Sequence, residues 1–275
     1  LNINGSGPGG SGGGGVMIRN ENSASVTIEN CEIVYNSSGD YGGGIYAGHI
    51  NNTLTIKNSI IANNSSSNTG GIYHKATLTL ENCLFNNNTT TNSGGAEGGA
   101  IRSYYQASLT ITNCTFADNS AARGGAIHYE TNATCTIKNS IFWGNTASTG
   151  SQINADQGTV NVTYSDVSGG YSGTGNINSD PYFVNASSND YSLQNYSPAI
   201  GTGTSTGAPS TDINGTTRPT PSGSNPDMGA YENSNASAVP TVSSVSTTPA
   251  TSDGQYLEDD QINVAVTFSE DITVT

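Results

Sequence analysis

The residues best suited to chemistry in this chain are a lysine and two glutamates at matching places in a repeated pattern. Lys57 follows Glu29 by 28 residues and precedes Glu81 by 24 residues. A cation beside carboxylates is the kind of set that abstracts a proton from a sugar ring, so these three residues are the nearest candidates for catalysis. Whether these three side chains can act together depends on where the repeat places them.

Histidines and cysteines are the other candidates, as metal ligands or nucleophiles. The histidines are His49, His74 and His128, and the cysteines are Cys31, Cys83, Cys114 and Cys135. Their spacing matches no zinc motif, and no third ligand or carboxylate lies at a matching phase, so we expect exposed turn histidines and no metal site. The cysteines lie where other repeats carry Ser or a core Leu, which indicates small buried thiols without a disulfide.

A six-residue block returns six times and determines the architecture. It reads VTIENC from Val26, LTIKNS from Leu54, LTLENC from Leu78, LTITNC from Leu109, CTIKNS from Cys135 and a degraded VNVTYS from Val160. The starts are 28, 24, 31, 26 and 25 residues apart, a period typical of stacked supersecondary units. Only 10% of the residues are charged, but regularly spaced Ile, Leu, Val and Phe provide a core, so the chain is expected to fold.

Each repeat contains three predicted strands. In LTIKNS, Leu54 and Ile56 alternate with polar residues, as in a strand with one buried face. The alternation slips at Asn58, and Asn tolerates the left-handed conformation that a corner needs. A second short strand runs up to Asn64, and glycines introduce a third strand at Ile72. Because the turns are too short for a crossover helix, the sequence predicts an all-β, right-handed parallel β-helix of about six coils with three short strands per coil.

Stacked coils place equivalent residues in ladders about 4.8 Å apart. The corner asparagines are expected to stack carboxamide on carboxamide. Glu29, Lys57 and Glu81 then form an outward column of alternating sign, which avoids like-charge repulsion between adjacent coils. A regular column on a flat face is poor catalytic geometry, so we expect no catalytic residues.

The motif FxxN followed by GGAI carries a resemblance to a known family. It occurs at residues 85–88 with 98–101, and again at residues 116–119 with 124–127. Over residues 14–165 the chain resembles the repeats of polymorphic outer-membrane proteins and related bacterial surface β-helices. The resemblance implies a bacterial protein that is secreted or displayed at the cell surface.

The segment that follows the repeats has its own character. From Asp180 it reads DPYFVNASSNDYSLQNYSPAIGTG, and DMGAYE follows from Asp227. This resembles the C-terminal segment of secreted bacterial β-helix proteins. We expect residues 171–233 to cap the open end of the β-helix formed by residues 1–170, because an uncapped coil exposes its strand edges and its core. The capping side chains would be Tyr182, Phe183, Tyr191, Leu193 and Ile200.

Charge is distributed unevenly and limits the partners. The net charge of −14 would repel nucleic acid and anionic membranes, so neither is an expected partner. Residues 171–275 hold one cation, Arg218, against eleven acids. We expect Arg218 to be a structural partner of Asp212 or Asp227.

The end of the chain reads as a linker followed by part of a second domain. Residues 234–240 are rich in Ser, Ala and Pro and form the predicted linker. Residues 241–275 resemble the opening of a bacterial Ig-like β-domain and are too few to complete a sandwich of about seven strands. No apolar run of about 18 residues exists, so no transmembrane segment is predicted. Low Lys content and abundant Asn and Thr favour a secreted or cell-surface location.

The sequence favours a surface module that attaches to cells or glycans, without enzymatic activity or a cofactor. Its partners would be a host or neighbouring cell surface, a glycan, or like subunits. The longest loop between second and third strands is the candidate binding site, because insertions on one edge are where solenoids acquire partners. The loop runs from Thr89 to Glu97, and its candidate binding residues are Thr89, Thr90, Thr91, Asn92 and Ser93.

Three alternatives stay open. An incomplete Ig-like segment and exposed strand edges would suit a subunit that assembles into a filament or layer. Pectin and alginate lyases and some glycosidases use this fold, often with calcium, although no calcium motif supports that cofactor here. A flat Thr ladder could order ice, but Thr110 and Thr112 are the single Thr-x-Thr pair in the repeated block.

Overall fold

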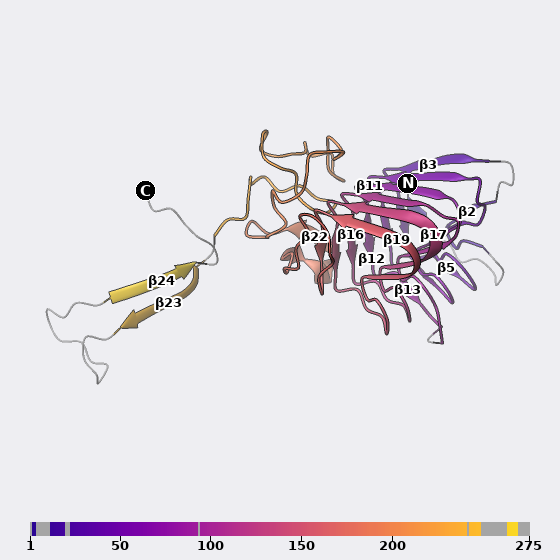
Figure 1. The fold of residues 1–275 in the computed structure, drawn as a ribbon, viewed down its shortest axis with the longest axis horizontal. Helices are drawn as coiled ribbons and strands as arrows, with labels where there is room; N and C mark the ends of the chain where they lie inside the picture. Colours follow the sequence, from indigo (N-terminus) through magenta and orange to yellow (C-terminus); the bar gives the residue numbers. More distant parts are fainter. Residues whose placement is uncertain are drawn as a thin grey trace.

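The chain forms a stack of parallel β-coils (Figure 1). A computed structural model describes residues 2–3, 12–19, 23–92, 94–240, 242–248 and 263–268. Adjacent coils pair in register, for example Leu54 with Leu78 and Leu78 with Leu109. The predicted all-β fold, with parallel coils that stack along one axis, is confirmed.

One parallel sheet contains the second strands of the coils. Its strands are β1 (Asn2–Ile3), β4 (Glu32–Val34), β8 (Ile60–Ala62), β12 (Leu84–Asn86), β16 (Thr115–Ala117), β18 (Ile141–Trp143) and β20 (Asp166–Val167). The rings of Phe85, Phe116 and Phe142 point inward and stack, with centroids 4.7 Å apart in each pair. This fully buried ladder forms one wall of the core.

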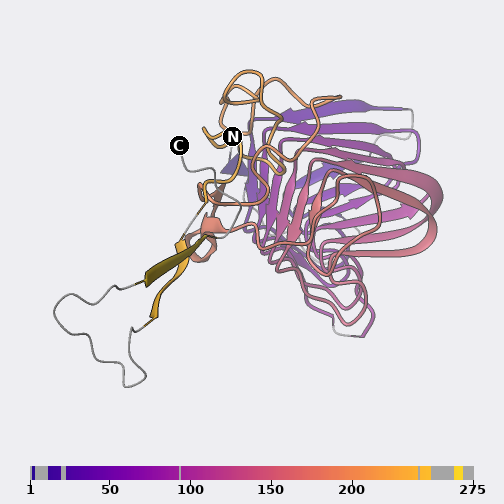
Figure 2. The same ribbon diagram turned by 60° about the vertical axis from the view of Figure 1, so that its left-hand side comes forward.

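A larger sheet contains the first and third strands. The first strands are β3 (Ser25–Glu29), β7 (Thr53–Lys57), β11 (Thr77–Glu81) and β15 (Leu109–Thr112). The third strands are β2 (Val16–Ile18), β6 (Ile45–Ala47), β10 (Ile72–His74) and β14 (Ile101–Tyr105). Later in the chain a third strand runs directly into the next first strand, giving β17 (Ile127–Lys138) and β19 (Ile153–Thr163). Figure 2 shows these two as long curved ribbons.

A fourth short strand occurs in three of the coils, one more strand per coil than predicted. These strands are β5 (Ser37–Ser38), β9 (Ser65–Ser66) and β13 (Thr89–Thr90), and they pair side by side. Isolated bridges continue the column from Thr89 to Ser120 and from Ser120 to Thr146. We call the side of the stack between second and third strands, which contains this column, the turn edge.

Left-handed corners turn the chain between strands, as predicted. The five predicted corners have φ between 46° and 53°, at Asn30, Asn58, Asn82, Asn113 and Asn139. A second set of left-handed corners follows the second strands at Tyr35, Asn63, Asn87, Asp118 and Gly144. Because its residue types vary, no repeated letter marks this second set in the sequence.

A buried asparagine ladder runs along the turn edge. Its members are at most 4% exposed, and they are Asn36, Asn64, Asn88, Asn119 and Asn145. Asn88 Oδ1 accepts hydrogen bonds from the backbone N–H and from Nδ2 of Asn64, at 3.1 and 3.0 Å. Asn88 Nδ2 in turn donates to the carbonyl of Ile61 at 2.7 Å. The expected carboxamide stacking is therefore continuous in this ladder, where it satisfies buried polar groups of neighbouring coils.

The expected cap has two parts with different positions. Residues 171–177 close the last coil, because Tyr171 packs against the core and the Asn176 side chain accepts the Ser165 N–H at 3.0 Å. Residues 180–233, here called the strap, run instead along one side of the stack (Figure 1). The strap contains β21 (Phe183–Asn185), a 3-10 turn (Ala186–Ser188) and β22 (Asp190–Leu193), and β21 and β22 pair antiparallel.

The strap covers the outward face of the second strands, which differs from the expectation that its apolar residues close the open end. Tyr191 packs with Leu84 and Ala117, and Ile200 packs with Ile141. All five are at most 2% exposed. The second strands carry apolar residues on both faces, so their outward face has to be covered as well as their inward one.

Corner asparagines also hold the strap to the coils. Nδ2 of Asn82, Asn113 and Asn139 donates to the backbone carbonyls of Thr211, Asp227 and Thr204, respectively. The asparagines that adopt the left-handed corner conformation thus also supply long-range hydrogen bonds to the strap.

Buried charges fix the shape of the strap. Arg218 has the expected structural role, but its ion pair is with Glu232 at 3.2 Å, and it contacts Asp227 through the backbone carbonyl. Arg218 also donates to the backbone carbonyls of Asp227, Gly229 and Ala230. The carboxylates of Asp212 and Asp227 are engaged elsewhere, because each accepts backbone N–H groups from turns of the strap.

A separate hairpin lies beyond the strap. β23 (Val242–Thr248) pairs antiparallel with β24 (Asn263–Phe268). In both ribbon views the hairpin stands apart from the coils (Figures 1 and 2). These two strands are the described part of the segment expected to open an Ig-like domain, and the rest of residues 241–275 lies outside the described residues.

Candidate functional site

The loop singled out from the sequence begins in a strand and ends in an exposed turn. Thr89 and Thr90 form β13, whereas Thr91 and Asn92 are exposed. Asn92 Oδ1 accepts the Gly94 N–H at 2.9 Å, which stabilises the turn. Ser93, the last predicted binding residue, lies outside the described residues.

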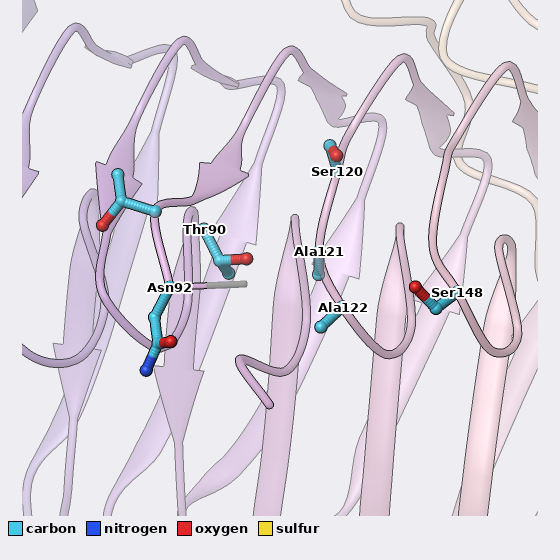
Figure 3. A pocket seen from close by; sticks show the side chains of 7 residues that line it. Thr90, Asn92, Ser120, Ala121, Ala122 and Ser148 are labelled. Atoms are coloured by element: carbon cyan, nitrogen blue, oxygen red, sulfur yellow. The ribbon is translucent and has the colours of Figure 1, made fainter. Parts of the chain in front are cut away.

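This loop and the turns of the following coils line a shallow hollow at the turn edge. The hollow has a volume of about 230 Å³ and is lined by Thr90, Thr91, Asn92, Ser120, Ala121, Ala122 and Ser148. Figure 3 shows these side chains arriving from successive coils. A second hollow of about 300 Å³ shares Ser120, Ala121 and Ser148 and adds Thr146 and Ala147. Together they form a neutral depression along the coil axis, which we call the trough.

A network of charged side chains borders the trough. It begins at Glu97, where the inserted loop returns to the stack and bridges to Arg123, the residue after Ala122. Glu97 pairs with both Arg123 and Arg102, and the Arg102 Nη2–Glu97 Oε2 distance is 2.6 Å. Arg102 also pairs with Glu130 at 2.7 Å. Asp156 completes the network through Arg123 at 3.3 Å.

The prediction that His74 and His128 are exposed was wrong, because both are fully buried. His74 points into the coils, where its ring nitrogens contact Ser103 Oγ at 2.6 Å and the Ala76 carbonyl at 3.0 Å. Burial lowers the pKa of His74 to about 4. His128 lies within the charged network, with Nε2 3.3 Å from Glu130 Oε2. The structure therefore places carboxylates beside His128, although the sequence pattern offered none at a matching position.

A cluster of tyrosines extends from the charged network along the outward face of the third strands. The Tyr73 ring lies 5.4 Å from the stacked ring of Tyr46 and 6.2 Å from that of Tyr104. The Arg102 guanidinium lies over Tyr104 at 5.2 Å, and Lys75 Nζ lies over the same ring at 5.1 Å. Sequence reasoning missed this cluster, although a Tyr directly after the Ile that opens the third strand is a usable signal.

The catalytic candidates from the sequence form a paired column. Glu29, Lys57 and Glu81 stand opposite one another in β3, β7 and β11. Lys57 Nζ lies 3.2 Å from both carboxylate oxygens of Glu81, and both side chains are about one-third exposed. The charge of this lysine is thus engaged by its neighbour, which agrees with its interpretation as a stacking device.

The four cysteines are free thiols, and three of them are buried. Cys83 and Cys114 occupy the expected ladder on adjacent coils, where the Cys83 N–H donates to Cys114 Sγ at 3.4 Å. Burial raises the pKa of Cys114 and, to about 12, that of Cys135. Both side chains therefore stay protonated, and a protonated thiol is a poor nucleophile.

The fold and its ladders agree with a comparison against known families. Residues 2–185 match the family described as the right handed beta helix region. The chain belongs to the right-handed β-helix family. Neither the curated proteins nor the solved structures contain a match to this β-helix.

Within the residues that the structure describes, no helix is long and apolar enough to cross a bilayer.

Proposed function

We propose that this β-helix is a non-enzymatic module of a bacterial cell surface or secretion product, and that it attaches to glycans through the trough. The observation that supports this most is the position of the predicted loop. Thr90, Thr91 and Asn92 line one continuous depression with residues of the next two coils. The insertion therefore adds to a surface that the regular turns already form.

The chemistry of the trough suits a hydroxyl-rich polymer. Its lining carries hydroxyl, amide and methyl groups and no charge. Such groups can donate and accept hydrogen bonds with sugar hydroxyls. The depression is open and follows the coil axis, so it favours an extended chain over a small enclosed ligand. A polysaccharide of a host or neighbouring cell is the partner that fits these properties.

The hairpin extends the proposal to the C-terminal segment. Val242, Val245, Val264 and Val266 of β23 and β24 are between 45% and 63% exposed. Two strands with apolar side chains gain stability when a further sheet packs on them. We therefore keep the expectation that they open an Ig-like domain, which would display the β-helix at a distance from its attachment point.

Affinity electrophoresis against immobilised polysaccharides tests the attachment. The panel would contain neutral mannan and xylan together with acidic polygalacturonate and alginate. The wild-type chain should be retarded by at least one of them, and Ser148→Trp should abolish the retardation because an indole fills a hollow of about 230 Å³. Ser222→Trp is the matched control, since Ser222 is exposed on the strap away from the trough.

Two results would count against the proposal. Retention of binding by Ser148→Trp would place the site elsewhere. Release of unsaturated sugar from polygalacturonate or alginate would favour the lyase alternative instead.

A further inference from the structure

The imidazole of His128 faces three carboxylates. Its Nε2 lies 3.3 Å from Glu130 Oε2, 3.7 Å from Asp156 Oδ2 and 3.8 Å from Glu97 Oε2. The side chain of His128 is 0% exposed, and that of Glu97 is 6% exposed. A buried nitrogen thus has oxygen atoms of three acids around it, contributed by three neighbouring coils.

The spacing is longer than hydrogen bonds require and close to what a shared metal ion requires. All three contacts exceed the usual range for an N–H···O bond, which ends at about 3.2 Å, although the one to Glu130 does so only slightly. Ligand atoms bound tetrahedrally to one ion at about 2.0–2.2 Å lie about 3.3–3.6 Å from one another. Single ligand atoms of Glu97, His128 and Glu130 all lie within 4.8 Å of one another. Small side-chain movements would bring them onto a common ion.

The charge balance of the network also favours a bound cation. The network contains three carboxylates, Glu97, Glu130 and Asp156, but only two guanidinium groups, Arg102 and Arg123. One negative charge is left over beside a nitrogen that can bind a metal. The arginines do not prevent this, because each carboxylate oxygen has two lone pairs and can accept from a guanidinium while it binds an ion.

Asn154 contacts both His128 and Asp156. Its Nδ2 lies 3.1 Å from His128 Nδ1 and donates to Asp156 Oδ1 at 2.8 Å. With Nδ2 toward Nδ1, the histidine proton lies on Nε2, which faces the carboxylates. An ion on Nε2 takes the place of that proton, so binding requires release of the proton or its transfer to Nδ1 with rotation of the Asn154 amide.

We propose that Glu97, His128 and Glu130, with Asp156 as a fourth ligand, bind a divalent transition-metal ion such as Zn²⁺. A nitrogen ligand beside carboxylates suits Zn²⁺ or Mn²⁺ better than Ca²⁺, which takes oxygen ligands. This replaces the expectation of no metal, which rested on the lack of a third ligand. It does not depend on glycan binding, because ion binding is measured without a glycan.

Titration of the metal-free protein with Zn²⁺, followed by calorimetry and by thermal unfolding, tests the site. We expect one ion per chain and a higher unfolding temperature. Glu130→Gln should weaken binding by more than about tenfold, because loss of a direct ligand weakens metal binding at least as much as loss of a residue that supports a ligand. Asp156→Asn, a change at a side chain that is 40% exposed, is the variant least prone to misfolding and should weaken binding in the same direction.

Two controls separate this site from other ligands. His49→Gln should bind as the wild type does, because His49 lies in a turn outside the network. Bound Co²⁺ should show no thiolate charge-transfer absorption, because the site contains no cysteine. The proposal is overturned if no ion binds saturably, if Glu130→Gln and Asp156→Asn bind as tightly as the wild type, or if the cobalt spectrum shows thiolate ligation.

Discussion

The outward faces of the second strands and of the third strands differ in what covers them. On the second strands, Leu84, Ala117 and Ile141 point outward and are at most 2% exposed, because the strap covers them. On the third strands, Tyr104 is 36% exposed and the side chain of Asp156 is 40% exposed. The strap thus covers the face of the second strands, whereas these side chains of the third strands are open to solvent.

The treatment of charge follows the same division. Arg218 within the strap has a side chain that is 0% exposed and pairs with an equally buried Glu232. Arg123 beside the trough has a side chain that is 42% exposed. Buried ion pairs are costly to break, whereas exposed pairs contribute little. The covered face should therefore dominate stability and the open face should tolerate change.

The largest effect is expected from Arg218→Ala. Removal of the guanidinium leaves Glu232 buried without its cation and three backbone carbonyls without a donor. Loss of one partner of a buried pair costs about 3–5 kcal/mol. Urea unfolding measures the change, and Arg123→Ala on the open face should cost less than half as much. Equal losses of unfolding free energy in Arg218→Ala and Arg123→Ala would contradict the expected difference between the faces.

The second effect is a dependence on pH with opposite signs on the two faces. Burial raises the pKa of Asp166 in β20 to about 7. The folded chain thus holds a proton that the unfolded chain, with a pKa of about 3.9, has lost. This stability is complete below about pH 4 and is lost as pH rises toward 7, by up to about 1.4 kcal/mol per pH unit.

Glu130 on the open face shows the reverse. Burial alone would raise its pKa, but hydrogen bonds from His128 and Arg102 outweigh burial and lower it. Its contribution is present above the ordinary pKa of a glutamate and is lost as pH falls through the lowered value. Unfolding measured across pH should therefore flatten near neutrality in Asp166→Asn and near acid pH in Glu130→Gln. Identical pH profiles for the wild type and both variants would contradict these assignments.

A pair of tyrosines gives a smaller effect. Tyr191 is 1% exposed and its hydroxyl donates to Asp118 Oδ2 at 2.9 Å. Tyr191→Phe should cost about 1.5 kcal/mol, as expected for a hydrogen bond to a charged group. Tyr104→Phe on the open face should leave the free energy of unfolding unchanged. A measurable loss in Tyr104→Phe would show that the tyrosine cluster belongs to the stable core.

The coils could be predicted from the sequence because their physics repeats. Every coil needs inward apolar residues at the same phase and a left-handed corner, so Leu54, Asn58 and their equivalents recur. The loop at Thr89–Thr90 was recognisable for the opposite reason, as a departure from the regular length. Both signals are local, and each can be read from a few residues of the repeat.

The charged network could not be predicted because its members do not recur. Glu97 belongs to the inserted loop, and it reaches Arg102 and His128 only because the insertion folds back onto the stack. The strap poses the same difficulty, since Tyr191 and Ile200 have no repeated counterpart and pack against coils far away in sequence. Non-repeated segments find their places through long-range packing, which no periodicity encodes.

The smallest effect is expected at the lysine that first suggested catalysis. Lys57 and Glu81 form an exposed pair, and such pairs contribute about 0.2–1 kcal/mol. Lys57→Met should therefore lower the free energy of unfolding by less than about 1 kcal/mol at low salt, and the difference should shrink in about 1 M salt, where charges are screened. Glu29→Gln on the neighbouring strand is the matched control for the other half of the column. If the wild type degraded alginate and a stable Lys57→Met variant did not, the column would instead be catalytic.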